Sequence, residues 1–222
     1  MATSPAADPQ RPPVPATPAP EPDRWYAQEV LAGSKVRLVP LTDEHAEGFL
    51  DALWAADGAP EVYRWLGSEP PATLDQVRSV IRAALAQRAA GQRFPFAQLD
   101  ADTGQFIGTT SYYELAPASR ALAIGYTWLG TPWWRTGHNT ESKLLLLGHA
   151  FDTLGAARVV WHTDVLNTRS RAAIERLGAT MEGVVRKHRI RANGSWRDTA
   201  QFAMIDQDWP AARQRLRAAL GR

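Results

Sequence analysis

The segment from Tyr126 to Leu154 constrains the fold more strongly than any other part of the sequence. It reads as a strand that ends near Leu129, a tight loop that holds Gly137, and a helix over about residues 140 to 155. Such a loop points unpaired backbone N–H groups at whatever lies over the start of the helix, and the helix dipole adds partial positive charge there. The segment therefore predicts a site for a phosphate-bearing cofactor.

The composition excludes several classes of protein. With 222 residues and 45% apolar content, the chain is long enough to bury the core of one ordinary domain plus an appendage. The 25 basic and 23 acidic side chains leave a net charge of only +2, which is too small to indicate nucleic-acid binding. Because the chain has no cysteine, it has no disulfide, no thiolate metal site and no cysteine nucleophile.

The first part of the chain differs from the rest. Residues 1–22 hold eight of the sixteen prolines and almost no large apolar side chain, so burial cannot offset the entropy of ordering them. We expect a disordered Pro/Ala-rich tail over residues 1–24 and one domain over residues 25–222. No apolar run reaches the roughly 18 to 20 residues needed to span a bilayer, and the start lacks the apolar core of a signal peptide. A cytoplasmic protein without membrane contact is expected.

Periodicity predicts an alternation of helices and strands. Strands are expected over residues 35–41, 94–99, 106–115, 122–129 and 158–164, and helices over residues 42–54, 73–90, 167–177 and 211–220. Val80 falls on the apolar stripe of the second helix, and the last helix is expected to cover an edge of the fold. Two further strands, 184–191 and 196–205, flank Asn193-Gly194, a signal for a hairpin with a type I′ turn. The strand, helix and strand from 122 to 164 form a βαβ crossover.

Three segments carry a resemblance to a known family: Ile-Gly-Tyr-Thr-Trp-Leu at 124–129, Trp-Arg-Thr-Gly-His-Asn-Thr-Glu at 134–141, and Asn-Thr-Arg-Ser-Arg-Ala-Ala-Ile-Glu-Arg-Leu-Gly at 167–178. With the order of elements, they resemble the GNAT N-acetyltransferase superfamily, RimJ/RimL type, over about residues 35–209. The resemblance implies an α/β (α+β) fold, with a mixed, mostly antiparallel central sheet, a splayed parallel pair and flanking helices. It also implies acetyl-coenzyme A (acetyl-CoA) as the cofactor.

The resemblance also implies which residues meet the cofactor. They are Trp128, Leu129, Arg135, Thr136, Gly137, His138, Asn139, Thr140, Asn167, Ser170 and Arg171. The loop departs from the family pattern, because the central Gly137 matches while Trp134 and Asn139 stand at flanking positions that usually hold other residues. Asparagine tolerates a left-handed backbone and can cap a helix, so the prediction of an anion site is kept.

The chemistry requires groups that handle protons. An amine attacks only when neutral, so a base must remove its proton. The candidate bases are His188 and Glu114, with Glu141, His162 and Asp164 as further alternatives. The family tyrosine that protonates the departing thiolate is replaced by Ile174. The resemblance to RimL-type proteins instead implies Ser170, which can equally satisfy backbone N–H groups in the first turn of its helix.

The acceptor is less constrained by the sequence. A protein N-terminus or a small-molecule amine is expected, with Tyr112, Tyr113, Trp133 and the basic run 186–191 lining the entrance. The length of the acyl chain is left open, and a homodimer is a reasonable assembly. The alternative function is a non-catalytic acyl-CoA sensor or interaction module. Nucleic-acid binding through residues 186–191 would instead require strongly salt-dependent affinity and is not expected.

Overall fold

The computed structural model describes residues 22–221, so the predicted tail over residues 1–21 lies outside the described residues. The described chain begins with a short helix, α1 (Pro22–Tyr26), that starts within the range predicted as tail. Trp25 on this helix is only 1% exposed and belongs to the larger apolar core. The N-terminal segment therefore contributes to the core before the first strand begins.

The described residues form one sheet of eight strands in the order β1-β2-β3-β4-β5-β6-β8-β7. The strands are β1 (Leu31–Ala32), β2 (Val36–Pro40), β3 (Arg93–Asp100), β4 (Phe106–Ala116), β5 (Ala121–Leu129), β6 (Arg158–Asp164), β7 (Thr180–Ile190) and β8 (Trp196–Ile205). Every neighbouring pair is antiparallel except β5 and β6, which are parallel and joined by the predicted βαβ crossover. The predicted mixed, mostly antiparallel sheet is confirmed.

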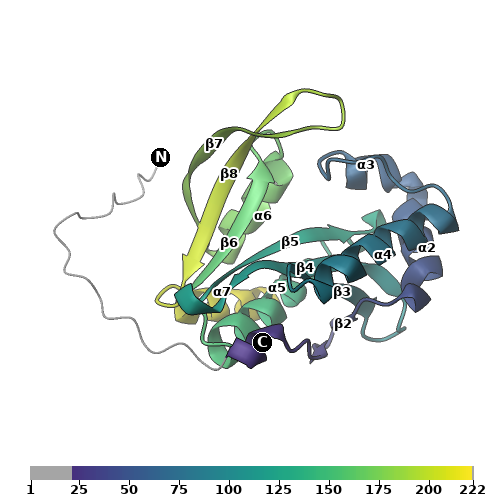
Figure 1. Cartoon of the computed structure of the whole chain (residues 1–222). Helices are drawn as coiled ribbons and strands as arrows, with labels where there is room; N and C mark the ends of the chain where they lie inside the picture. Colours follow the sequence, from purple (N-terminus) through teal and green to yellow (C-terminus); the bar gives the residue numbers. More distant parts are fainter. Residues whose placement is uncertain (1–21, 222) are drawn as a thin grey trace.

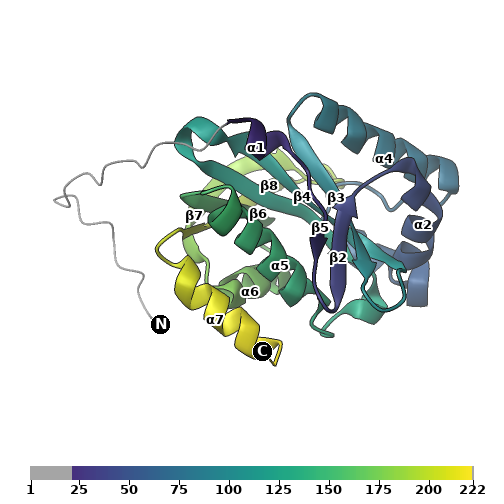
Figure 2. The same cartoon turned by 90° about the horizontal axis from the view of Figure 1, so that it is seen from below.

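Helices cover both faces of the sheet (Figures 1 and 2). On one face lie α2 (Ala46–Trp54), α3 (Ala59–Tyr63) and α4 (Leu74–Ala89), with their own apolar cluster against β3 and β4. On the other lie α5 (His138–Gly148), α6 (Thr168–Leu177) and α7 (Trp209–Ala219), packed into the larger core. A π-helical segment, His149–Thr153, continues α5, and short 3-10 turns connect several elements. The sheet thus separates two apolar cores.

The parallel pair in the middle of the sheet comes apart. Strands β5 and β6 form only three residue pairs, in which residues 121–123 of β5 lie opposite residues 158–160 of β6. Both strands continue beyond these pairs. A bulge between β4 and β5, with Tyr126 at φ 51°, bends β5 at the same level. From Gly125 to Leu129, one edge of β5 therefore has no partner strand. This is the predicted splay.

The hairpin turn and the surface of α4 differ from the predictions. Gly194 has φ 79°, but Asn193 does not have a positive φ, so the predicted type I′ turn is wrong. The Gly194 N–H bonds the Arg191 carbonyl and the Arg191 N–H bonds the Ser195 carbonyl, which makes a longer loop with glycine at its left-handed position. Val80, predicted on the apolar stripe of α4, is 41% exposed, because the helix buries a narrower stripe.

The C-terminal helix packs against two other helices at the outside of the fold. Pro210 lies in the first turn of α7, as predicted, and Trp209, Ala212 and Leu216 are buried. These side chains pack with α5 and α6 in the larger core, and α7 lies at the periphery of the fold (Figure 2). The helix thereby supports the crossover helix.

Candidate functional site

The start of α5 is shaped to present backbone N–H groups. Gly137 precedes the helix with φ 94°, a left-handed conformation that glycine adopts at little cost. No side chain caps this end, so the N–H groups of the first turn, from His138 to Thr140, have no acceptor within the helix. Arg135 is exposed beside them and also has a positive φ of 63°. The backbone N–H groups therefore lie exposed to a ligand at the position where the sequence predicts an anion site.

The side chain of His138 is part of the support for this loop. Its Nδ1 lies 2.6 Å from the Thr136 hydroxyl, and its Nε2 lies 2.9 Å from a carboxylate oxygen of Asp100 at the end of β3. Burial raises the pKa of Asp100, but hydrogen bonds from Thr103 and His138 outweigh it and lower the pKa to about 2. The His138 backbone can therefore face a ligand while its side chain holds the loop to the β3–β4 turn.

Glu141, one of the candidate bases, lies in the first turn of α5 and is fully buried. Its carboxylate accepts hydrogen bonds from the backbone N–H groups of Ser34, Lys35 and Val36, the last two at 2.6 and 2.8 Å. A buried carboxylate that satisfies three backbone donors in this way stays in place as a structural anchor. Glu141 fixes the β1–β2 turn against α5.

The C-terminal half of β5 has one edge directed into the splay. The Gly130 N–H donates to the Ile107 carbonyl on β4, so by strand alternation the Leu129 N–H points away from β4. The Leu129 carbonyl accepts from the indole N–H of Trp134 at 2.8 Å. Trp128 faces the other way, because its ring packs on Phe49 of α2. Leu129 therefore offers a free strand donor, whereas Trp128 belongs to the α2–α4 core.

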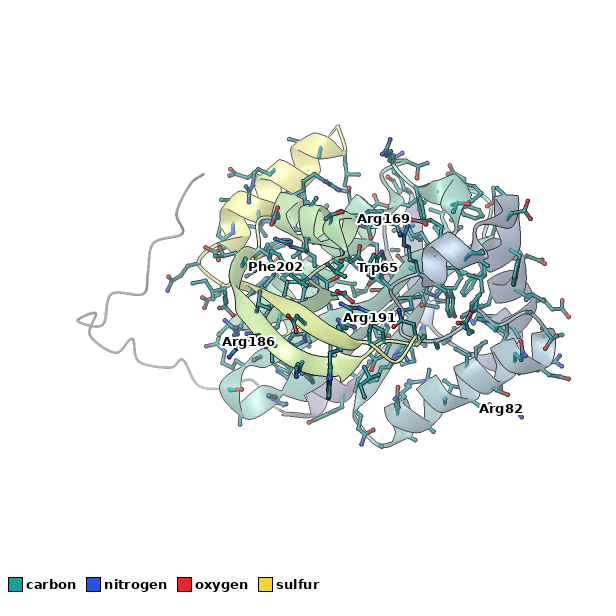
Figure 3. All side chains as sticks on the ribbon, turned by 90° about the horizontal axis from the view of Figure 1, so that it is seen from above. Trp65, Arg82, Arg169, Arg186, Arg191 and Phe202 are labelled. Carbon is teal, nitrogen blue, oxygen red and sulfur yellow. The ribbon has the colours of Figure 1, made fainter. Side chains whose placement is uncertain are left out.

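The start of α6 lies on the opposite side of the splay. The Asn167 side chain accepts from the Ser170 N–H at 3.0 Å, as a helix cap does. The Ser170 hydroxyl has no hydrogen-bond partner among residues 22–221. Arg171 donates to the Val165 carbonyl, and its buried Nε has no partner in the described chain. Arg169, labelled in Figure 3, stacks on Trp134 of the α5 loop at 4.0 Å.

On the α4 side of the sheet, Tyr113 reaches across β5. Its ring lies over Gly125, where a Cβ atom would come within 2.7 Å of it. Its hydroxyl lies 2.9 Å from Nδ1 of His162 on β6. Tyr113 pairs with Ala123, and His162 follows the last residue of β6 that pairs with β5 by two positions. The Tyr113–His162 pair therefore sits where the splay begins.

The neighbours of His162 determine its tautomer. The Gln201 amide N–H₂ donates to a Glu182 oxygen at 3.1 Å, which directs its carbonyl oxygen toward Nε2 of His162 at 3.3 Å. A carbonyl only accepts, so Nε2 carries the hydrogen and Nδ1 has the free lone pair. Tyr113 then donates its O–H to Nδ1. Arg158 holds Glu182 in a two-pronged ion pair, which anchors the whole chain of contacts.

Two of the three predicted catalytic residues meet around His162. A carboxylate oxygen of Glu114 lies 3.9 Å from its Nδ1, and the His188 ring lies 6.2 Å away. Burial, followed by the nearby Arg189 charge, lowers the pKa of His188, which favours the neutral ring. Asp164 is committed elsewhere, in a two-pronged ion pair with Arg191. The third predicted residue, Ser170, lies apart from them on α6.

A cavity of about 430 Å³ opens beside this cluster. Its wall includes Tyr113, Glu114, Tyr126, Arg93, Gln87 and Arg189. Two residues predicted at the entrance lie elsewhere: Tyr112 faces α5 and bonds the Leu146 carbonyl, and Trp133 packs against both apolar cores. Neighbouring residues of a strand point to opposite faces, so Tyr112 and Tyr113 cannot both line one cavity.

Lys143 of α5 is a buried cation that sequence reasoning missed. Its ammonium nitrogen donates to the hydroxyls of Thr110 and Thr127 at 3.0 and 2.9 Å. Burial lowers the pKa of Lys143 to about 7. The available signal was its spacing, because Leu146 and Leu147 follow at three and four positions and place Lys143 on the same inward face. The lysine ties α5 to the bulged part of β5.

Residues 22–221 contain neither a metal-binding cluster nor a membrane-spanning helix. No cluster of three or more His, Cys, Asp or Glu side chains in this part of the chain is arranged to bind a metal ion. Among the same residues, none of the helices combines the length and the apolar character that crossing a membrane requires.

Comparisons with known proteins identify the family. Residues 35–180 match the acetyltransferase (GNAT) domain family. The uncharacterized N-acetyltransferase YoaA of Bacillus subtilis (strain 168) is 31% identical over 180 residues, which cover 79% of this chain and 96% of YoaA. A GCN5-related N-acetyltransferase from Brucella melitensis shares the fold with a TM-score of 0.80 and 31% identity, over 90% of this chain and 86% of that chain.

A further solved structure, Mycobacterium smegmatis RimJ in complex with CoA-disulfide, has a TM-score of 0.70. It is 24% identical, covers 86% of this chain and 91% of that chain, and is alike in fold. The family match covers the splayed strands, the α5 loop and the start of α6 described above. The chain therefore belongs to the GNAT acetyltransferase family and is an N-acetyltransferase.

Proposed function

We propose that this protein transfers the acetyl group of acetyl-CoA to a primary amine by direct attack within a ternary complex. The GNAT family takes its acetyl group from acetyl-CoA, which supports the donor. The observation that carries the acceptor chemistry is the Tyr113–His162 pair, at the start of the splay and beside an open cavity. With no cysteine in the chain, attack without a covalent enzyme intermediate is the simplest route.

The residues around the splay fit this cofactor. The left-handed Gly137 and the N–H groups that follow it suit a diphosphate, with Arg135, Thr136, Asn139 and Thr140 around them. The Leu129 N–H lies on the unpaired edge of β5 and can bond the thioester carbonyl oxygen, on which negative charge develops during attack. When bound, acetyl-CoA supplies an acetyl group activated as a thioester. Mycobacterium smegmatis RimJ, which has the same fold, was solved in complex with CoA-disulfide, and this supports coenzyme A as the ligand.

On the α6 side, the proposed contacts come from Asn167, Ser170 and Arg171. The unpartnered Ser170 hydroxyl is available to hydrogen-bond the departing sulfur, where Ile174 offers no proton. The buried Nε of Arg171 is a donor that lacks an acceptor in the described chain, as expected where a polar ligand completes the site.

The acceptor amine arrives mainly as an ammonium ion and has to lose a proton. We assign this step to a relay in which the Tyr113 oxygen receives that proton while the Tyr113 proton moves to Nδ1 of His162. The Glu114 carboxylate, 3.9 Å away, stabilises the resulting imidazolium. In this assignment His162 is the base. Glu114 and His188, the predicted bases, are its neighbours.

Release of free thiol in the presence of acetyl-CoA and a panel of primary amines tests the proposal. We expect Tyr113→Phe and His162→Gln each to lower kcat by about 10² to 10³, the usual loss of a general base. Coenzyme A affinity, measured by calorimetry, should stay unchanged in both variants. Tyr26→Phe, an exposed tyrosine on α1, is the matched control.

The outcomes separate the alternatives. Full activity in both variants would place the base elsewhere, with His188→Gln and Glu114→Gln as the next variants to measure. A wild-type protein that binds coenzyme A but releases no thiol with any amine would support the sensor function instead.

A further inference from the structure

We propose that the acceptor carries a carboxylate as well as its amine, and that Arg189, together with Arg93 and Arg197, binds this carboxylate at the wall of the cavity. This inference rests on the proposed function, because it names the class of amine that the same site accepts.

Three arginines around the cavity lack a counter-ion. Arg93 and Arg189 line it, and Arg197 lies directly opposite Arg189 in the β7–β8 register. Across residues 22–221, no carboxylate lies within ion-pairing distance of any of the three. Other arginines of the same region are paired, such as Arg191 with Asp164 and Arg158 with Glu182. Arg93, Arg189 and Arg197 thus bring three guanidinium groups to one region of the described chain without an acidic partner.

The partners of these arginines are neutral or missing. Arg93 donates to the Ser111 hydroxyl at 2.9 Å and to the Gln87 side-chain oxygen at 3.4 Å, and its guanidinium lies 3.7 Å from the centre of the Tyr126 ring. Burial lowers the pKa of Arg93 to about 10. The buried Nε of Arg197 has no hydrogen-bond partner in the described chain. Partly buried guanidinium groups without an anion are costly, and a bound carboxylate would remove that cost.

Arg189 is placed to receive such a ligand. It is exposed and lines the cavity, and its side chain forms no ion pair or hydrogen bond with residues of the described chain. Burial, followed by the Arg189 charge, lowers the pKa of Arg197, which shows that the two cations repel each other. A planar carboxylate between them suits guanidinium geometry, because each guanidinium can donate two parallel hydrogen bonds.

The cavity also carries the opposite charge. Glu114 lines it beside Tyr113 and lies close to His162, so the ammonium end of a ligand is attracted toward the groups that remove its proton. The lining of the cavity therefore offers a carboxylate to an amine and guanidinium groups to a carboxylate. The volume of about 430 Å³ suits a small amino acid or the terminal residues of a peptide. The shared chemistry is an amine and a carboxylate separated by a few bonds.

Thiol release with matched amines tests the inference. Glycine, β-alanine and 4-aminobutyrate are each compared with the corresponding amide, and peptides with Asp at the second position are compared with peptides that have Asn there. We expect kcat/KM to favour the carboxylate in at least one matched pair by tenfold or more. The free acids and the peptides distinguish a small-molecule acceptor from a protein N-terminus.

Variants isolate the role of Arg189. Arg189→Gln should lower the ratio of kcat/KM for the carboxylate to kcat/KM for the amide by about tenfold. The wild type and the variant are measured with the same substrates, so differences in amine basicity affect both ratios equally. Arg82→Gln, an equal loss of charge on the exposed surface of α4, should leave the ratio unchanged (Figure 3). If Arg189→Gln does not fold, the wild-type ratio should instead fall as salt rises from 50 to about 500 mM, since screening weakens exposed charge pairs.

The two proposals fail in different ways. Thiol release that is equal for carboxylates and amides, or a ratio that neither Arg189→Gln nor salt changes, overturns this inference and leaves the transferase function in place. No release with any amine contradicts the transferase function itself.

Discussion

The charged side chains at the two ends of the splay between β5 and β6 differ in whether they have partners. At the start of α5, Glu141 accepts hydrogen bonds from three backbone N–H groups and His138 is paired with Asp100. At the cavity on the other face, Arg93 and Arg189 have no acidic partner within residues 22–221. The comparison teaches that satisfied charges hold the loop in shape, whereas unsatisfied charges mark where ligand groups complete the site.

The largest effect on the free energy of unfolding is expected at Glu141, near the start of α5. Glu141→Ala removes the acceptor of three backbone donors, one of them buried, and hydrogen bonds to a charged group are worth roughly 1.5 to 3 kcal/mol each. We expect the free energy of unfolding to fall by about 3 to 5 kcal/mol, measured by urea denaturation. Glu114→Ala, which removes a carboxylate whose side chain is 56% exposed, should change it by less than about 0.5 kcal/mol. Equal losses in the two variants would break the comparison.

Lys143 differs from the other charged side chains of α5. It is buried, its hydrogen-bond partners are two hydroxyl groups, and no carboxylate of the described chain pairs with it. Its pKa of about 7 in the folded protein lies below the ordinary value of 10.5, so between these values the unfolded chain binds more protons than the folded one. The free energy of unfolding should therefore rise with pH over this interval. From pH 7 to 9 we expect the wild type to gain about 2 kcal/mol relative to Lys143→Met.

Chemical denaturation at several pH values measures this gain. Lys187→Met replaces an exposed lysine and is the control, for which we expect no such pH-dependent gap. A flat difference between the wild type and Lys143→Met across this pH range would mean that the buried amine titrates normally.

The smallest effect is expected at Gly137. A valine there would adopt φ 94°, which costs roughly 1 to 2 kcal/mol, and its Cβ would press on the Lys35 side chain at 3.3 Å. Gly104→Val has a similar φ of 73° and open space around it, so it reproduces the backbone strain away from the loop. We expect both variants to lose similar stability, while only Gly137→Val loses about tenfold in coenzyme A affinity by calorimetry. Equal affinity in the two variants would falsify the assignment of the loop.

Much of the architecture could be predicted because it is encoded locally. The strand over 158–164, the helix that Asn167 caps and the antiparallel run from β3 to β5 appear with bounds close to the predicted ones. The type of turn at Gly194 was predicted wrongly, because the Asn-Gly sequence does not specify how many residues the loop between β7 and β8 contains. Helix α3 and the burial of Trp25 were missed, because short segments with few apolar residues have no measurable period.

The candidate site was predicted in part for the same reason. The loop at Gly137 and the cap at Asn167 are local features, and the sequence indicated both. His162 was only one of several alternatives, and Arg93 and Arg197 were not considered. These side chains come from β3, β6 and β8, and no spacing along the chain relates them. Their proximity follows from the order of strands in the sheet.

By itself, the sequence determined the type and order of most elements, the family resemblance and the place of the loop at Gly137, because periodicity, capping residues and a left-handed glycine act over a few positions. Only the tertiary structure decided which charges are paired and which are not. In the folded chain, Glu141 is buried and accepts hydrogen bonds from three backbone N–H groups. Tyr113 lies over Gly125 with its hydroxyl next to His162. Arg189 lines the cavity and has no acidic partner within residues 22–221. The physical reason is that ion pairing and desolvation depend on distances between atoms, and those distances are set by strands far apart in the chain.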